Sequence, residues 1–192
     1  MKHFCSLKNF TLVLSLLLAT SMTSADELSG HISGYAGLKS LNSSDWPDLD
    51  KHFAMGIFFD IKRESWPISI ALDVLDTGGK HEHDGMEDLG HTTEFHLGIR
   101  KIFVNQHKKV QPYIGGGVSF MYAEQEFETN NVTEKQDDGD TGAWLGAGMY
   151  YEINPLFTLG LDARYSYGEV ILFDKERKAG GIYAGITAGY HF

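Results

Sequence analysis

The stretch GIYAGITAGYHF, residues 181–192, decides the fold of this chain. Glycine, tyrosine, threonine and histidine occupy every second position of it, and the positions between are the mainly apolar series Ile182, Ala184, Ile186, Ala188, Tyr190 and Phe192. Successive side chains of a β-strand point to opposite faces of the sheet. The period of two therefore predicts a strand with one apolar face.

The same alternation recurs along the rest of the chain. It is clear in six further segments, residues 53–61, 68–74, 95–103, 114–122, 144–151 and 157–166. A first strand, over about residues 28–38, alternates less regularly. Together these segments predict eight strands of about 9–12 residues each, a length that crosses a bilayer when the strand is tilted.

The connections between the predicted strands alternate in length. Three are short (residues 63–67, 105–110 and 154–155) and four are long and polar (residues 40–51, 77–91, 128–140 and 168–180). Barrels of the outer membrane have short periplasmic turns and longer external loops. If both termini are periplasmic, every long connection falls outside. The sequence thus predicts an all-β chain folded as an eight-stranded antiparallel up-and-down transmembrane β-barrel.

A secreted soluble barrel of the lipocalin kind is the alternative architecture. It would turn its apolar residues inward and would need a polar outer face on every strand. The face opposite the apolar one is instead mostly glycine, alanine and serine with a few charges. That composition makes a poor surface toward water, so the membrane barrel is favoured.

Residues 1–25 predict a cleavable Sec-type signal peptide, which leaves residues 26–192 as the barrel domain. Lys2 and Lys8 form a positive region before an apolar run over residues 10–19, which is too short to span a membrane. Thr23 and Ala25 provide small residues before the cleavage point. The one cysteine, Cys5, lies in this segment, so the barrel has no thiol chemistry. A formal net charge of −10 makes nucleic acid an unfavourable partner.

The charged residues of the predicted strands fall on one face. Seven of them form the candidate site: Asp60, Asp73, Glu94, His96, Arg100, Asp162 and Arg164. An Arg or Lys facing lipid at mid-membrane would cost about 2–4 kcal/mol, so this face is expected to be the barrel interior. Buried charges must be paired. The set therefore predicts either a network of salt bridges that closes the barrel or the lining of a narrow water path.

Aromatic residues near the ends of strands are expected to form girdles at the membrane interfaces. The candidates are Tyr113, Tyr122, Tyr151, Phe157, Tyr165 and Tyr190.

Two loops carry groups that could bind a divalent metal. His81, His83 and His91 lie among four carboxylates in one predicted loop, and a second loop holds Glu134, Asp137, Asp138 and Asp140. Imidazole and carboxylate are suitable ligands, but the second loop lacks the spacing of an EF-hand. Solvated acidic loops are the favoured interpretation of both, and no cofactor is predicted.

His31 and Ser33 share one face of the first predicted strand. Their spacing is similar to that of the histidine and serine with which lipid A deacylase barrels cleave an acyl ester. Both residues are expected to face inward near the periplasmic end, whereas the substrate lies in the outer leaflet.

Three segments resemble a known family. Residues 181–192 resemble the terminal strand of bacterial outer-membrane proteins, and VQPYIGGGV, residues 110–118, resembles a "PY-x-G-x-G" strand of OmpA-like and opacity-type barrels. The segments 146–151 and 159–165 resemble the strand pair near the C-terminus of those barrels. The chain is thereby identified as a small OmpA-like, OmpX-type outer-membrane barrel. The resemblance implies that Tyr190 and Phe192 form a signal for the barrel assembly machinery, and that outer-membrane lipid and lipopolysaccharide are partners.

The first functional hypothesis is a non-enzymatic outer-membrane protein. Its barrel would anchor external loops for surface interaction or support envelope integrity. One alternative is a narrow channel for ions or small hydrophobic compounds, as in the OmpW type. The other is a barrel enzyme that modifies lipid A.

Overall fold

The computed structural model describes residues 28–42, 46, 50–83, 86–104, 109–129, 132–172 and 175–192. Residues 80–88, 126–134 and 172 are described, where they are described at all, by their backbone alone. The predicted signal peptide lies outside the described residues. Within the described part of the chain, no helix is both long and apolar enough to cross a membrane.

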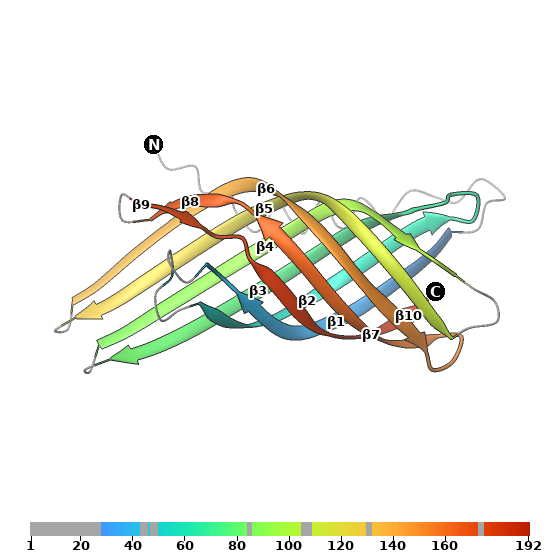
Figure 1. Ribbon diagram of the computed structural model, residues 1–192, viewed down its shortest axis with the longest axis horizontal. Coiled ribbons are helices and arrows are strands. Elements are labelled where there is room, and N and C mark those ends of the chain that lie inside the picture. The colour runs from blue at the N-terminus through green and yellow to red at the C-terminus, as the bar shows by residue number, and fades with distance from the viewer. Residues whose placement is uncertain are drawn as a thin grey trace.

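Eight strands close into a barrel: β1 (Leu28–Ser40), β2 (Lys51–Arg63), β3 (Ser69–His83), β4 (Met86–Ile102), β5 (Val110–Thr129), β6 (Val132–Glu152), β7 (Phe157–Tyr167) and β10 (Ile182–His191). Each pairs antiparallel with its neighbours, and β10 returns to β1 (Figure 1). Two short strands between β7 and β10, β8 (Glu169–Leu172) and β9 (Lys175–Lys178), pair with each other. The predicted fold class is confirmed.

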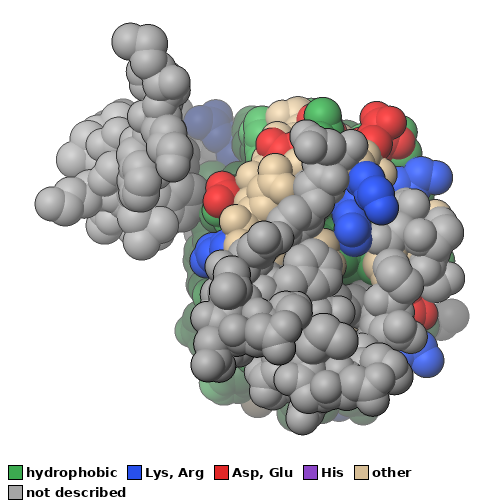
Figure 2. Space-filling view, turned by 90° about the vertical axis from the view of Figure 1, so that its left-hand side faces the viewer, with side chains coloured by type: hydrophobic (Ala, Val, Ile, Leu, Met, Phe, Trp, Pro, Cys, Tyr) green, Lys and Arg blue, Asp and Glu red, His purple; other side chains and the backbone are tan. Residues whose placement is uncertain are grey.

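The two ends of the barrel differ. One end, called here the turn end, holds the start of β1, the last residue Phe192 and the connections after β2, β4 and β6. The opposite end, called the hairpin end, carries the far ends of the long β3–β4 and β5–β6 pairs together with β8 and β9 (Figure 1). Figure 2 views the hairpin end and shows acidic and basic side chains on its described part.

Two of the long connections expected to be loops are largely strand. The ladder between β3 and β4 continues to the pair His83–Met86, and that between β5 and β6 continues to Thr129–Val132. The predictions of loops over residues 77–91 and 128–140 were therefore wrong. Beyond the membrane neither face of a hairpin meets lipid, so the strand continues without the apolar alternation that marks it within the bilayer.

The alternation sorts side chains between the lipid-facing wall and the interior. Large apolar residues project outward and are strongly exposed, including Leu145 at 68%, Ile186 at 62% and Ile182 at 60%. Tyr113 is a correction to the predicted girdles, because its ring is 2% exposed and lies inside the barrel. It shares its parity along β5 with the inward-facing Ser119, which explains its position.

An apolar group of buried side chains closes the hairpin end. This outer cap consists of Leu41, Trp46, Met121, Ala123, Val170 and Ala179. Trp46 is fully buried, and its indole Nε1 donates a hydrogen bond to the carbonyl of Lys178 at 2.8 Å. The cap thus joins residues before β2 to residues after β9.

The barrel seam at the turn end is completed by Phe192. The amide of Phe192 donates to the carbonyl of Gly30 at 2.9 Å, and the amide of Gly30 donates back at 2.7 Å. The phenyl ring of Phe192 lies where a Cβ of residue 30 would be, so a larger residue at this position would displace the ring. The ring also stacks on Phe59 with centroids 6.2 Å apart.

Candidate functional site

The candidate site is a set of charged side chains in the middle of the barrel. All seven predicted members are buried, with exposures of 0–3%, and they come from β2, β3, β4 and β7: Asp60, Asp73, Glu94, His96, Arg100, Asp162 and Arg164. Each points inward because it shares its parity with the other inward-facing residues of its strand. With Lys39 of β1 they form one connected group, called here the interior network.

Arg100 and two aspartates form the part of the network nearest the turn end. Arg100 Nη1 donates to both carboxylate oxygens of Asp60 at 2.8 Å, and Nη2 donates to Asp73 Oδ2 at 2.6 Å. Several charge-assisted bonds from one planar guanidinium hold both carboxylates in fixed orientations.

Arg164 continues the network toward the hairpin end. Its Nη1 donates to the same Asp73 oxygen at 2.9 Å, while its Nε and Nη2 donate to the two oxygens of Asp162 at 2.8 and 3.1 Å. Asp73 therefore bridges the two arginines. Desolvated charges of this kind are tolerated only when they are paired in this way.

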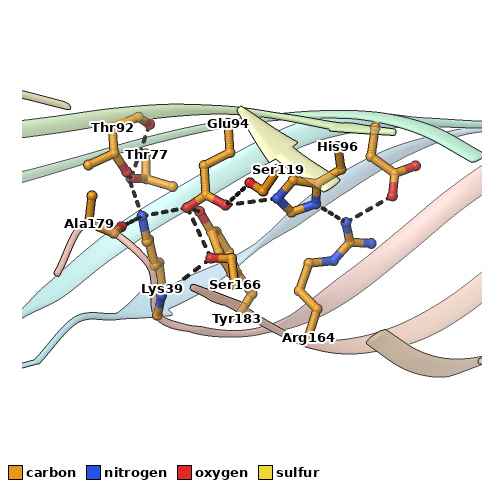
Figure 3. A network of polar contacts seen from close by, with 12 residues as sticks. Lys39, Thr77, Thr92, Glu94, His96, Ser119, Arg164, Ser166, Ala179 and Tyr183 are labelled. Atoms are coloured by element: carbon orange, nitrogen blue, oxygen red, sulfur yellow. Dashed lines mark hydrogen bonds and ion pairs between the residues drawn. The ribbon is translucent and has the colours of Figure 1, made fainter. Parts of the chain in front are cut away.

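The third part of the network is centred on Glu94 (Figure 3). Lys39 Nζ donates to Glu94 Oε1 at 2.8 Å, and the Tyr183 hydroxyl donates to the same oxygen at 2.6 Å. Lys39 also donates to the hydroxyl of Thr92 and to the carbonyl of Ala179, each at 2.7 Å. Because Ala179 belongs to the outer cap, Lys39 ties the cap to the interior network.

His96 connects the Glu94 part to the arginines. Arg164 Nη1 lies 3.3 Å from His96 Nδ1, and His96 Nε2 lies 2.8 Å from Glu94 Oε2. An arginine can only donate, so Nδ1 is its acceptor and the proton is on Nε2, which donates to Glu94. The network is thus continuous from Lys39 to Asp60.

Aromatic rings fill the space around these charges. The Arg164 guanidinium lies 3.9 Å from the centroid of the Phe58 ring, and Trp144 stacks on His96 with centroids 5.2 Å apart. The hydroxyl of Tyr113 donates to Asp162 at 2.6 Å. Its ring can lie against the wall because residue 148 is glycine, where a Cβ would collide with it. The interior is packed, with ring and guanidinium groups in direct contact.

Sequence reasoning missed several members of this interior. Lys39 was not predicted, and Tyr183 and Trp144 were placed on the inward face by their alternation but were not assigned to the charged set. For Lys39 the signal was weak, because β1 has small or polar residues on both faces.

The predicted metal ligands are not brought together in the described part of the protein. The side chains of His81, His83 and Glu134 lie outside the described residues, and His91 is half-exposed with its Nε2 2.9 Å from Asp76. Asp138 and Asp140 accept backbone hydrogen bonds from Ile171 and Glu169 of β8. Among the described residues, no group of three or more His, Cys, Asp or Glu side chains could hold a metal ion.

The His31 and Ser33 pair faces the interior. His31 is 3% exposed and Ser33 is 1% exposed. The ring Nε2 of His31 is hydrogen-bonded to the hydroxyl of Thr158 at 2.7 Å. Neither side chain reaches the lipid-facing wall.

A closed barrel with an apolar outer wall and a polar, ion-paired interior defines an integral outer-membrane β-barrel protein. The chain belongs to the outer membrane protein beta-barrel domain family, whose model matches residues 10–192. No curated protein matches.

Solved structures show the same fold at low sequence identity. OprG from Pseudomonas aeruginosa is 13% identical with a TM-score of 0.61, covering 90% of this chain and 99% of OprG. Ail of Yersinia pestis, in complex with the heparin analogue sucrose octasulfate, is 16% identical with a TM-score of 0.58, covering 86% and 99%. Neisserial surface protein A is 16% identical with a TM-score of 0.56, covering 88% and 98%. These structures support the fold, and the family match supports the outer-membrane location.

Proposed function

We propose that this protein is a closed, non-enzymatic barrel that anchors rigid external hairpins for surface interaction or envelope integrity. The observation that carries the proposal is the continuous interior network beneath the outer cap. The network fixes the cross-section of the barrel by charged hydrogen bonds, and Lys39 extends this fixation to Ala179 near the mouth. The β3–β4 and β5–β6 hairpins then project from a rigid base, with the hairpin end outside the cell.

The conductance of a planar bilayer distinguishes this function from the channel alternative. The side chains of the network and the cap are buried in the described interior, so the purified barrel is expected to show no unit conductance. A reproducible unit conductance that changes when Arg100 is replaced by methionine would establish a channel and overturn the proposal. The variant Lys109→Met, altered at an exposed position on the turn end, provides the matched control.

The lipid A-modifying alternative has a separate test. The inward orientation of His31 and Ser33 supports a non-enzymatic role. Mass spectrometry of lipid A from cells with and without the protein is expected to show the same acyl pattern. A change in that pattern that is lost in the variant Ser33→Ala would demonstrate an enzyme.

Assembly and location also belong to the proposal. The seam formed by Phe192 and Gly30 supports a role for Phe192, together with Tyr190, in recognition by the barrel assembly machinery. The protein is expected in outer-membrane fractions beside lipopolysaccharide, with the mature chain beginning at residue 26. It should migrate differently on SDS gels before and after heating. Release of the mature chain by osmotic shock would contradict this location.

A further inference from the structure

The lipid-facing wall across β4, β5, β6, β7 and β10 is hollowed into an apolar groove. Its volume is about 870 Å³, and it is floored by small residues that include Gly116, Ala147 and Ala163. Leu145 and Ile182 stand along one side of it, with 68% and 60% of their surfaces exposed.

The strand register gives the course of this groove. Lys101 pairs with Ile114, Ile114 with Ala147, Ala147 with Ala163, and Ala163 with Ala184. Lys101 is next to the last residue of β4 at the turn end, whereas Ala184 is near the opposite end of β10. The row therefore climbs diagonally from the turn end toward the middle of the barrel.

Larger side chains form a second ridge beside the alanines. This ridge consists of Met149 on β6, Leu161 on β7 and Ile186 on β10, each two residues along its strand from an alanine of the row. The three pair across neighbouring strands, and 44–62% of their surfaces are exposed. Three strand spacings separate Ile114 from Ala184, roughly 15 Å at about 4.8 Å each. This distance runs across the strands, and because the strands of such a barrel tilt by about 40°, the row rises only roughly 10 Å along the barrel axis, within the depth of one leaflet of the roughly 30 Å hydrocarbon core.

Lys101 gives the lower end of the groove a positive charge. Its ammonium donates to the carbonyl of Pro67 at 2.6 Å, and a lysine has three donors, so two are left for a ligand within the described part of the chain. Arg164 also borders the groove, but its guanidinium is held inside the barrel by Asp73 and Asp162. None of the described residues that line the groove is acidic.

The described part of the turn end carries more basic than acidic residues. Its bases are Lys62, Arg63, Lys101 and Lys109, and its acids are Glu64 and Glu152. Short turns mark the periplasmic side of such barrels, so the ammonium of Lys101 lies at the inner leaflet, where phospholipid headgroups are found. Long basic side chains near a membrane interface reach out to that level.

We propose that this groove binds one anionic phospholipid of the inner leaflet. An acyl chain lies over Gly116, Ala147 and Ala163, and the headgroup phosphate is paired with Lys101. The groove is immersed in the bilayer, so its occupant must present apolar surface, and the charge at its foot selects a negative headgroup. This site is independent of the function proposed above.

Native mass spectrometry of the folded mature protein tests the proposal. The protein is released from detergent micelles that contain equal amounts of phosphatidylglycerol and phosphatidylcholine. We expect one retained lipid, mostly phosphatidylglycerol. The variant Lys101→Gln should lose about fivefold in that preference, the effect of one basic residue at a charged lipid surface. Lys109→Gln, an exposed lysine at the same end outside the groove, should leave the preference unchanged.

A second variant tests the groove separately from the charge. Ala163→Leu fills the floor from an outward-facing position, where added apolar bulk meets lipid and leaves the interior untouched. It should reduce retention of both lipids, whereas Ala143→Leu, on β6 and outside the groove, should not. Heat-dependent mobility on SDS gels verifies that each variant is folded. Equal retention of both lipids by the unaltered protein, retention that neither variant changes, or a protein dimer in place of a bound lipid would overturn the proposal.

Discussion

Replacement of Lys39 by methionine is the sharpest test of the interior network. Methionine keeps most of the volume of the side chain and removes its charge. The variant leaves Glu94 buried without its ammonium partner, and it also removes the donors to Thr92 and to the carbonyl of Ala179. The protein is expected to fold but with a lower free energy of unfolding.

The size of the loss follows from the contacts that remain. Removal of one partner of a buried ion pair costs about 3–5 kcal/mol. Glu94 still accepts hydrogen bonds from Tyr183 and His96, so the lower end of that range, about 3 kcal/mol, is expected. At a slope of about 2 kcal/mol per molar urea, the midpoint of unfolding should fall by about 1.5 M.

Reversible urea unfolding in lipid vesicles, followed by tryptophan fluorescence, measures this loss. The double variant Lys39→Met with Glu94→Gln removes both charges. Its loss in the free energy of unfolding should be about 2 kcal/mol smaller than the sum of the losses of the two single variants. Lys51→Met, at an exposed lysine near the same end, is the control. If Lys39→Met costs no more than this control, or the double variant is additive, the ion pair does not stabilise the barrel.

Three further predictions concern the packing, the buried histidine and the cap. Gly148→Val displaces the Tyr113 ring and should lower the free energy of unfolding by about 1–3 kcal/mol in the same urea titration. Gly78→Ala, where an added Cβ meets nothing, should leave it unchanged, and equal unfolding midpoints for the two variants would refute this. His31→Ala should cost about 2–4 kcal/mol, because it removes the hydrogen bond to Thr158 and leaves a cavity where the buried ring packs on Tyr150, and a loss below about 1 kcal/mol would contradict that role. Trp46→Ala should cost about 3–5 kcal/mol without producing current in planar bilayers, because the interior network remains below it; a current would show that the cap alone seals the barrel.

The barrel could be predicted because lipid imposes a strong pattern on its strands. Within the bilayer one face must be apolar, so residues 182–192 and the six other regular segments show their alternation in the sequence. Above the bilayer both faces meet water and that constraint ends. The ladder nevertheless continues to His83–Met86, because backbone hydrogen bonds need no particular side chains.

The site was predictable in composition but not in connectivity. Charge on the glycine-rich face indicated that Asp60, Arg100 and their companions lie inside, yet no sequence pattern states that Asp73 bridges two arginines. Those contacts depend on the stagger between strands distant in the sequence. Tyr113 was misplaced because its position near a strand end outweighed its parity, although the parity was the better guide.

The three tryptophans of this chain lie at three different levels along the barrel. Trp66 lies exposed at the turn end, Trp144 stacks on His96 in the middle, and Trp46 is buried within the outer cap at the hairpin end. Proteins that retain one tryptophan each would therefore emit from three depths. Quenchers attached at defined positions along lipid chains would then report when each tryptophan reaches its depth during insertion. The order of these times would show whether the cap closes before or after the strands have crossed the bilayer.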